Sequence, residues 1–217
     1  MRNIFALFVP TMLAALLLVG CAAPATTGSS GDGSGDVNFR LLISDQPNAI
    51  EDFEELWVTI SLIGLVPADG SSAGHTEVTL DPPISVNLVE LIDENAVAAW
   101  EGYIPEGEYS KVFLYVDSVD GLLVGSGDPI NIKLPSNKLQ LDYNFVIEEG
   151  NDGGVTNFVY DITVIRAGNS GMYLLLPQLG QSGPDREFKE MEHTEKRVSF
   201  GGPPEWVASR AHGKPVS

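Results

Sequence analysis

Residues 139–148 read Leu-Gln-Leu-Asp-Tyr-Asn-Phe-Val-Ile-Glu, in which apolar and polar side chains alternate along most of the segment. The apolar positions on one side are Leu139, Leu141, Tyr143, Phe145 and Ile147. A period of two is typical of a β-strand that buries one side and exposes the other. This segment therefore predicts a half-buried strand, and related patterns occur on both sides of it.

Seven further strands are predicted from alternating or β-branched segments. They cover residues 37–44, 57–65, 76–80, 109–119, 129–134, 158–166 and 172–179. Pro129 opens one of them and a lysine follows, which is typical of an edge strand. Strands at this regular spacing predict a mainly-β fold, an antiparallel β-sandwich, with a closed barrel as the alternative.

The one helical signal begins at Asn87. Asn87 and Glu90 have the spacing of a capping box, and Leu88, Leu91 and Ile92 share one helical face. We expect a short helix here that crosses from one sheet of the sandwich to the other.

The charge of the chain excludes one class of partner. The sequence contains 12 Lys and Arg residues and 30 Asp and Glu residues, which gives a formal net charge of −18. Five basic and 24 acidic side chains fall within residues 22–182, whereas residues 183–217 contain six of each. Such a surface repels the phosphates of nucleic acids and of anionic lipid headgroups. We therefore expect no nucleic-acid partner and no direct contact of the folded domain with a bilayer.

The N-terminus has the features of an export signal. Arg2 precedes an apolar run over residues 4–18, and the run ends at Leu18-Val19-Gly20-Cys21, which resembles the bacterial lipobox. That resemblance implies cleavage before Cys21 and acylation of its thiol. A plain transmembrane helix is the alternative, but the run is shorter than the roughly 20 residues needed to span a bilayer and contains Pro10. Ordinary secretory cleavage would leave a free thiol without a role.

The expected domain organisation follows from this start. Residues 1–20 form the signal peptide, residues 21–36 a lipidated Gly/Ser-rich flexible tether, and residues 37–182 the sandwich. Residues 183–217 are polar, contain prolines and mix both charges, so we expect a largely disordered tail. Within that tail, residues 186–197 are compatible with a transient helix, and Phe200, Trp206 and Val207 with a short linear motif for a partner.

The expected location is the cell envelope. Ala22 follows the lipidation cysteine, and because an Asp at this position retains lipoproteins in the inner membrane of many Gram-negative bacteria, its absence favours the outer membrane. Cys21 is the only cysteine, so no intramolecular disulfide can form.

Several short motifs occur in a fixed order along the predicted sandwich. They lie at residues 44–47, 57–61, 86–91, 104–109 and 174–177. In this order the chain resembles, over residues 39–179, a bacterial lipoprotein family known only as a domain of unknown function (4382). Gln46 and Leu176 depart from the family pattern. The resemblance implies a surface lipoprotein with a transthyretin-like, immunoglobulin-like or carbohydrate-binding-like sandwich, and it supplies no catalytic residues.

Candidates for catalysis are scarce. His75, His193 and His212 have no patterned neighbours, and acylation of Cys21 would leave no thiol nucleophile. The glycine-serine turns do not fit G-x-S-x-G, and no zinc-ligand spacing occurs. We therefore predict no catalytic residue and no enzyme activity, with an extracytoplasmic hydrolase that uses an Asp/Glu pair as the alternative.

Two acidic turns are candidate calcium sites. Residues 148–154, and Asp117 together with Asp120, offer the carboxylate and carbonyl oxygens that hard cations prefer. Neither has the spacing of a known calcium loop, and an acidic surface needs the same residues for solvation, so we assign no metal site and no cofactor beyond the lipid on Cys21.

The sequence as a whole predicts a lipid-anchored envelope lipoprotein that acts as a non-catalytic binding or structural module. The membrane would be contacted through the lipid alone, and the ligand would be a glycan, a peptide or a protein held by loops or an outer sheet face. Phe113 and Tyr115 would face outward in that interpretation. Packing of these two rings against the second sheet is the alternative.

Overall fold

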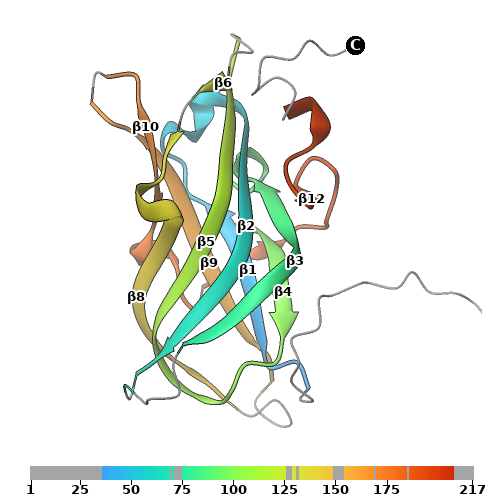
Figure 1. Ribbon diagram of the computed structural model, residues 1–217, viewed down its shortest axis with the longest axis vertical. Coiled ribbons are helices and arrows are strands. Elements are labelled where there is room, and N and C mark those ends of the chain that lie inside the picture. Colours follow the sequence, from blue (N-terminus) through green and yellow to red (C-terminus); the bar gives the residue numbers. More distant parts are fainter. Residues whose placement is uncertain are drawn as a thin grey trace, which may run out of the picture.

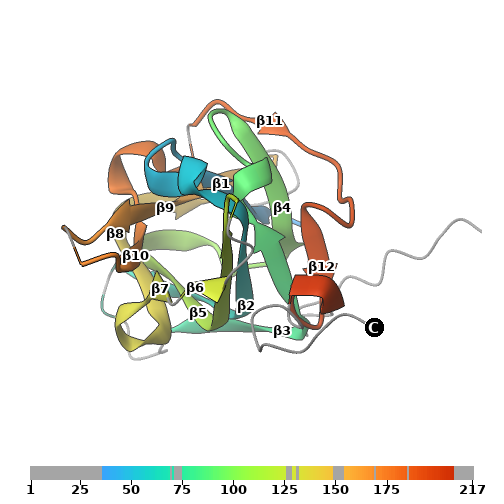
Figure 2. The same ribbon diagram turned by 90° about the horizontal axis from the view of Figure 1, so that it is seen from above.

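Two β-sheets pack face to face in the computed structural model, which describes residues 36–68, 70, 75–125, 129–130, 132–148, 154–168, 170–184 and 186–207 (Figures 1 and 2). The first sheet has the order β11-β4-β1-β9-β10-β7. Its strands are β1 (Phe39–Asp45), β4 (Asn95–Gly102), β7 (Ile132–Lys133), β9 (Thr156–Arg166), β10 (Tyr173–Pro177) and β11 (Lys189–Glu190).

The second sheet has the order β12-β3-β2-β5-β6, and β8 also pairs with β5. Its strands are β2 (Phe53–Pro67), β3 (Thr76–Asn87), β5 (Gly107–Leu123), β6 (Pro129–Ile130), β8 (Lys138–Ile147) and β12 (Val198–Phe200). Four 3₁₀ turns connect strands, namely η1 (Ala49–Asp52), η2 (Leu88–Glu90), η3 (Pro135–Asn137) and η4 (Leu179–Gln181). The sandwich prediction is confirmed, and the closed barrel is wrong because the two sheets remain separate layers (Figure 2).

Most strand pairs are antiparallel, as expected, but the first sheet is mixed. β1 and β9 run parallel over the whole length of β1, and the short strands β7 and β11 are also parallel to their neighbours. Because β1 and β9 are covered on both sides, most of their residues are buried regardless of alternation.

The burial of side chains along β8 follows the pattern predicted from the sequence. Leu139, Leu141, Phe145 and Ile147 are buried in the core, and the polar residues between them are exposed. Across the core, the Phe145 ring contacts Phe39 of β1 and Phe158 of β9.

The crossover at Asn87 differs from the expected capped helix. It is a single 3₁₀ turn, η2, which leads from the second sheet to the first. The Asn87 side chain does not cap it: its Oδ1 accepts a hydrogen bond from the backbone N–H of Leu56 at 3.1 Å, and its Nδ2 donates to the carbonyl of Lys196 at 3.0 Å. β4 then follows where no strand was predicted, because its Ala-rich sequence has neither alternation nor many β-branched residues.

The C-terminal segment also differs from expectation between residues 186 and 207. β11 pairs with β4 of the first sheet, and β12 pairs with β3 of the second, so the segment runs along one side of the sandwich (Figure 2). Phe188 packs on the outer face of the first sheet against a small cluster formed by Leu42, Ala96 and Val159. The expected transient helix over residues 186–197 is replaced by β11 and a turn, and residues 208–217 lie outside the described residues.

Two residues of the expected linear motif hold this segment in place. Val207 is fully buried, and the indole N–H of Trp206 donates to Glu55 at 3.0 Å, while Phe200 is exposed. The other oxygen of Glu55 accepts the indole N–H of buried Trp57 at 2.6 Å. Isolated apolar residues can dock in this way onto surfaces that other strands have already formed, without any periodic signal in their own sequence.

No helix within the described residues has the length and the apolar character required to cross a bilayer.

Candidate functional site

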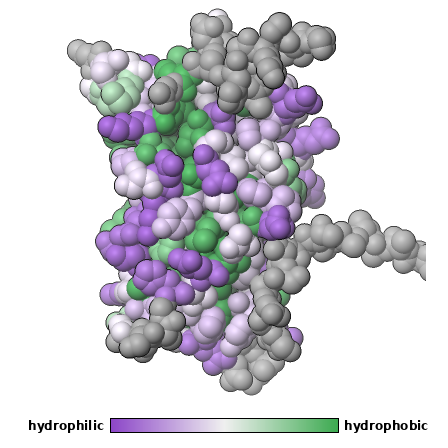
Figure 3. Space-filling view, in the orientation of Figure 1, coloured by the Kyte–Doolittle hydropathy of each residue, from purple (hydrophilic) through white to green (hydrophobic). Residues whose placement is uncertain are grey.

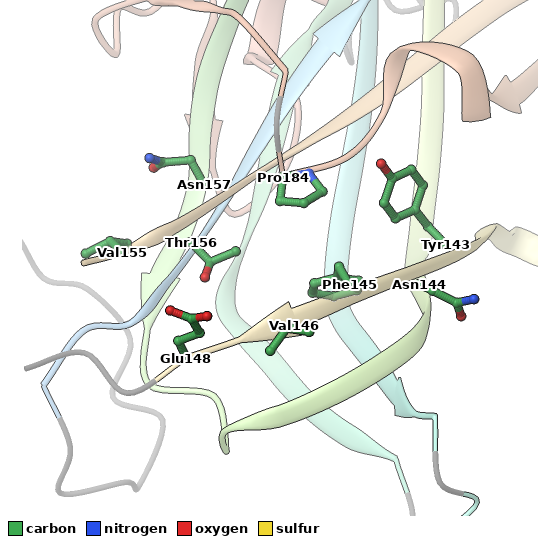
Figure 4. Close-up of a pocket in the computed structure, with 9 residues that line it drawn as sticks. All are labelled: Tyr143, Asn144, Phe145, Val146, Glu148, Val155, Thr156, Asn157 and Pro184. Atoms are coloured by element: carbon green, nitrogen blue, oxygen red, sulfur yellow. The ribbon is translucent and has the colours of Figure 1, made fainter. Parts of the chain in front are cut away.

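An open groove of about 430 Å³ lies between the second half of β8 and the start of β9 (Figure 4). It is lined by Tyr143, Asn144, Phe145, Val146, Glu148, Val155, Thr156, Asn157 and Pro184. One wall therefore belongs to the second sheet and the other to the first.

The groove exists because strand pairing stops on both sides of it. β8 pairs with β5 alone among the described strands, which leaves its other edge open. β10 covers β9 only as far as Ile162, where Pro177 is its last partner. The chain then makes the η4 turn and rejoins β9 at Val159, which exchanges two backbone hydrogen bonds with Gly183 at 2.9 and 3.0 Å. Pro184 follows and has no N–H to donate, so it forms a wall of the groove instead.

Aromatic rings form the floor. The Phe145 ring lies 4.9 Å from Phe158 and 5.7 Å from Tyr109, centroid to centroid, and Tyr143 contacts Phe158 edge-on at 5.8 Å. Phe145 is only 6% exposed, so the groove presents the edge of this cluster rather than an open ring face. Gly183 makes room for Tyr143, since a Cβ at this position would lie 2.7 Å from the Tyr143 hydroxyl.

The rim is polar and negatively charged. Glu148 reaches from the end of β8 toward Thr156 at the start of β9 (Figure 4), and it forms no ion pair with any residue in the described part of the chain. The nearest cation on β1, Arg40, contacts Asn157 Oδ1 at 3.4 Å, but it is already paired with Glu101 and Glu190.

Exposed valines complete the surface. Val146 is 50% exposed and Val155 is 39% exposed, one on each wall. The pattern of β8 assigns Asn144, Val146 and Glu148 to its solvent side, but nothing in the sequence indicates that this side faces an open gap.

Figure 3 shows the outer face of the second sheet, where hydrophobic residues form patches between hydrophilic ones. Phe113 and Tyr115 lie on this face, outside the core, and do not pack against the first sheet. Phe113 is nevertheless only 1% exposed, because its ring covers Gly64 and the Lys138 ammonium lies 3.7 Å from the ring centroid. Tyr115, at 40% exposed, is the aromatic side chain of the pair that remains accessible.

A second polar cluster is buried at the end of β1. Asp45 and Asp161 are 0% and 1% exposed, and Ser44 donates to Asp161 Oδ2 at 2.8 Å. Neither Asp45 oxygen has a hydrogen-bond partner within the described residues. Burial, and then the charge of Asp161, raise the pKa of Asp45 to about 9; burial raises the pKa of Asp161 to about 6, partly offset by the Ser44 hydrogen bond.

These two carboxyl groups do not form an open catalytic pair. Both lie under the surface, and neither lines the groove, where Glu148 is the one acidic side chain among the lining residues described.

The remaining sequence candidates are dispersed. Asp117 and Asp120 lie on β5, where each accepts a hydrogen bond from a serine hydroxyl, at 2.6 Å and 2.8 Å. Within the described residues, no cluster of three or more His, Cys, Asp and Glu side chains could hold a metal ion. His75 packs against Phe113, and His193 contacts the carbonyl of Ala98 at 2.7 Å.

Several sequence candidates lie outside the described residues. They are Cys21 with the signal peptide and most of the tether, residues 149–153 of the acidic turn, and His212.

Taken together, the layers, the mixed sheet and the single open side define a β-sandwich domain. The family model described as Domain of unknown function (DUF4382) matches residues 36–177, so the chain belongs to this family. The match ends at the last residue of β10, so η4, Pro184 and the docked C-terminal segment lie beyond it. Neither the curated proteins nor the solved structures contain a match to this chain.

Proposed function

We propose that the protein is a lipid-anchored envelope lipoprotein whose sandwich is a non-catalytic binding module, with its ligand in the groove between β8 and β9. The observation that carries this proposal is the groove itself, a concave site that combines an aromatic floor, exposed valines and polar rim groups. Ligand sites in proteins typically combine apolar lining with a few polar groups in this way.

Binding fits the groove better than hydrolysis does. Hydrolysis by an acid pair requires two carboxyl groups on opposite sides of the substrate, roughly 5–10 Å apart. Glu148 has no second acid opposite it among the described lining residues, and the pair Asp45 and Asp161 is buried.

The position of the groove also fits attachment through Cys21. Phe39 is the register partner of Thr156, and the carbonyl of Asn38 accepts the Thr156 N–H at 2.9 Å. The chain that comes from the tether therefore enters the domain next to a residue that lines the groove. A ligand bound there would be held close to the point of attachment.

Capture of envelope material tests the groove. We expect immobilised full-length protein to retain a ligand from solubilised envelope fractions, and Val146→Arg to reduce that retention about tenfold because the long cationic side chain would fill the groove. Val124→Arg is the matched control, since Val124 is 62% exposed and lies outside the groove. Equal retention by both variants would contradict the proposal.

Replacement of Cys21 tests the anchor. We expect Cys21→Ser to lose incorporation of radiolabelled palmitate and to leave the membrane fraction, because two or three acyl chains, at about 0.8 kcal/mol per buried CH₂, are the only anchor in this proposal. The lipidated wild type should sediment with the outer membrane in a Gram-negative host. Palmitate incorporation that persists in the serine variant would rule the anchor out.

A further inference from the structure

We infer that the groove binds an extended peptide rich in Lys or Arg, which adds to the free edge of β8 as an extra strand. This inference rests on the proposed function of the groove and names the chemical class of its ligand.

β8 is the longest strand whose second edge is wholly unpaired within the described fold. The first sheet ends at β11 and β7, each of two residues, and the second ends at β12 with three residues. β6, which shares the open side of β5 with β8, also has two residues. β8 has ten residues and pairs with β5 on one side alone. Proteins commonly protect long edges, because unpaired N–H and C=O groups along an edge recruit another strand.

The free edge of β8 borders the groove. Figure 4 shows the side chains of β8 and the start of β9 on the two sides of an open gap, with Pro184 between them. Besides its ladder with β5, the described backbone of β8 makes no hydrogen bond to another backbone segment. A peptide in this gap would therefore gain main-chain hydrogen bonds along β8 and side-chain contacts on alternate positions, as in strand-addition complexes.

The side chains of the groove favour a peptide over a glycan. A sugar ring needs an exposed aromatic face to stack on, and the rings of the floor are packed against one another, with Phe145 only 6% exposed. Val146 and Val155 are instead exposed on opposite walls, where they suit the β-branched or aliphatic side chains of an added strand.

The charge of the groove selects the charge of the peptide. Glu148 has no cationic partner within the described part of the chain, whereas the nearby cations are occupied: Arg40 by two glutamates, and Lys111 by Asp142 at 2.9 Å. The overall formal charge of −18 adds a long-range attraction for cations. A basic extended peptide meets both conditions.

The test is a selection from a random peptide display library against the full-length protein in detergent. We expect enrichment of sequences that alternate β-branched or aliphatic residues with Lys or Arg. Binding of an enriched, fluorescently labelled peptide, measured by anisotropy, should weaken with added salt and weaken about threefold in Glu148→Gln. Glu77→Gln on β3 is the matched control and should bind as the wild type does, because Glu77 is exposed and β5 and β2 lie between β3 and β8.

Backbone methylation tests the pairing itself. The same peptide with N-methyl groups on alternate amides should lose at least about tenfold in affinity in one of its two methylation registers, because only one set of N–H groups faces β8. Equal binding in both registers, or no enrichment from the library, would overturn the inference.

Two further results would overturn the inference without touching the proposed function. One is a glycan that binds the wild type but not Val146→Arg. The other is concentration-dependent dimerisation in sedimentation that Val146→Arg abolishes, since the ligand of the groove would then be a second copy of this chain.

Discussion

A chain that ends at Pro184 is expected to unfold with a free energy lower by about 5 kcal/mol than that of the full-length protein. The shortened chain loses the burial of Val198 and Val207, each of which contributes roughly 1.5–3 kcal/mol, and the smaller contribution of the half-buried Phe188. It also leaves Asn87 without the backbone groups of residues 196 and 197 that it pairs with. Urea denaturation followed by tryptophan fluorescence measures the difference.

The matched control is a chain that ends after Ala208. It retains every contact described for β11, β12 and Val207, and should unfold within about 0.5 kcal/mol of the full-length protein. Identical midpoints for the chains ending at Pro184 and at Ala208 would contradict the docked arrangement and favour a tail that contributes nothing to the fold.

The second large effect is expected for Asp45→Asn. The difference in unfolding free energy between this variant and the wild type should change sign with pH. The pKa of Asp45 rises from 3.8 to about 9 in the fold, so folding requires this carboxyl to take up a proton that the unfolded chain has released. At about pH 7 this requirement costs about 4 kcal/mol, at 1.36 kcal/mol per pH unit above 3.8. Asparagine needs no proton, although burial of its unpaired amide costs about 1–3 kcal/mol.

The direction of the pH dependence follows from the same shift. Because the folded pKa is raised, the stability contributed by Asp45 is complete below about pH 4 and declines as the pH rises toward 9. The stability of Asp45→Asn relative to the wild type should therefore increase by about 4 kcal/mol between about pH 5 and pH 8. The raised pKa of Asp161 adds a similar decline between about pH 4 and 6, which wild type and variant share.

Urea denaturation at both pH values gives this difference directly. Glu54→Gln, at an exposed position of β2, is the matched control for replacing a carboxyl group with an amide. A constant difference between Asp45→Asn and wild type would mean that Asp45 is ionised in the folded protein.

The fold class was predictable because side chains repeat with a period of two along most of β8 and more loosely along β5, and this period indicates strands whatever the details of packing. β4 was not, because Ala96, Ala98 and Ala99 carry little information about whether a segment is a strand. Asn87 shows a second limit of prediction from sequence. Its spacing to Glu90 suits a helix cap, but its side chain instead forms hydrogen bonds with the backbone of Leu56 and Lys196. The docked segment shows a third, since its few apolar residues pack on surfaces formed by distant parts of the chain, such as β3, where Val86 is the register partner of Val198.

The site was predictable only in part. The outward direction of Phe113 follows from the period of β5, but its cover by Gly64 and Lys138 depends on cross-strand register. The groove depends on β10 ending at Pro177 and on Pro184 interrupting pairing with β9. Both prolines indicate breaks in the sequence, but they do not indicate which neighbouring strand is left uncovered. The sequence does not predict the burial of Asp45 either, because a Ser-Asp-Gln-Pro sequence is typical of an exposed turn.

The docked C-terminal segment also limits self-assembly. A sheet can grow into a filament only if each molecule has two long free edges, so that it pairs with one neighbour at each edge. β11 pairs with Asn95 and Ala96 of β4, and β12 pairs with residues 84–86 of β3, so both outer edges are shortened, whereas the free edge of β8 extends over ten residues. Association of two copies through their β8 edges uses the longest free edge of each, which favours a pair of copies over a filament.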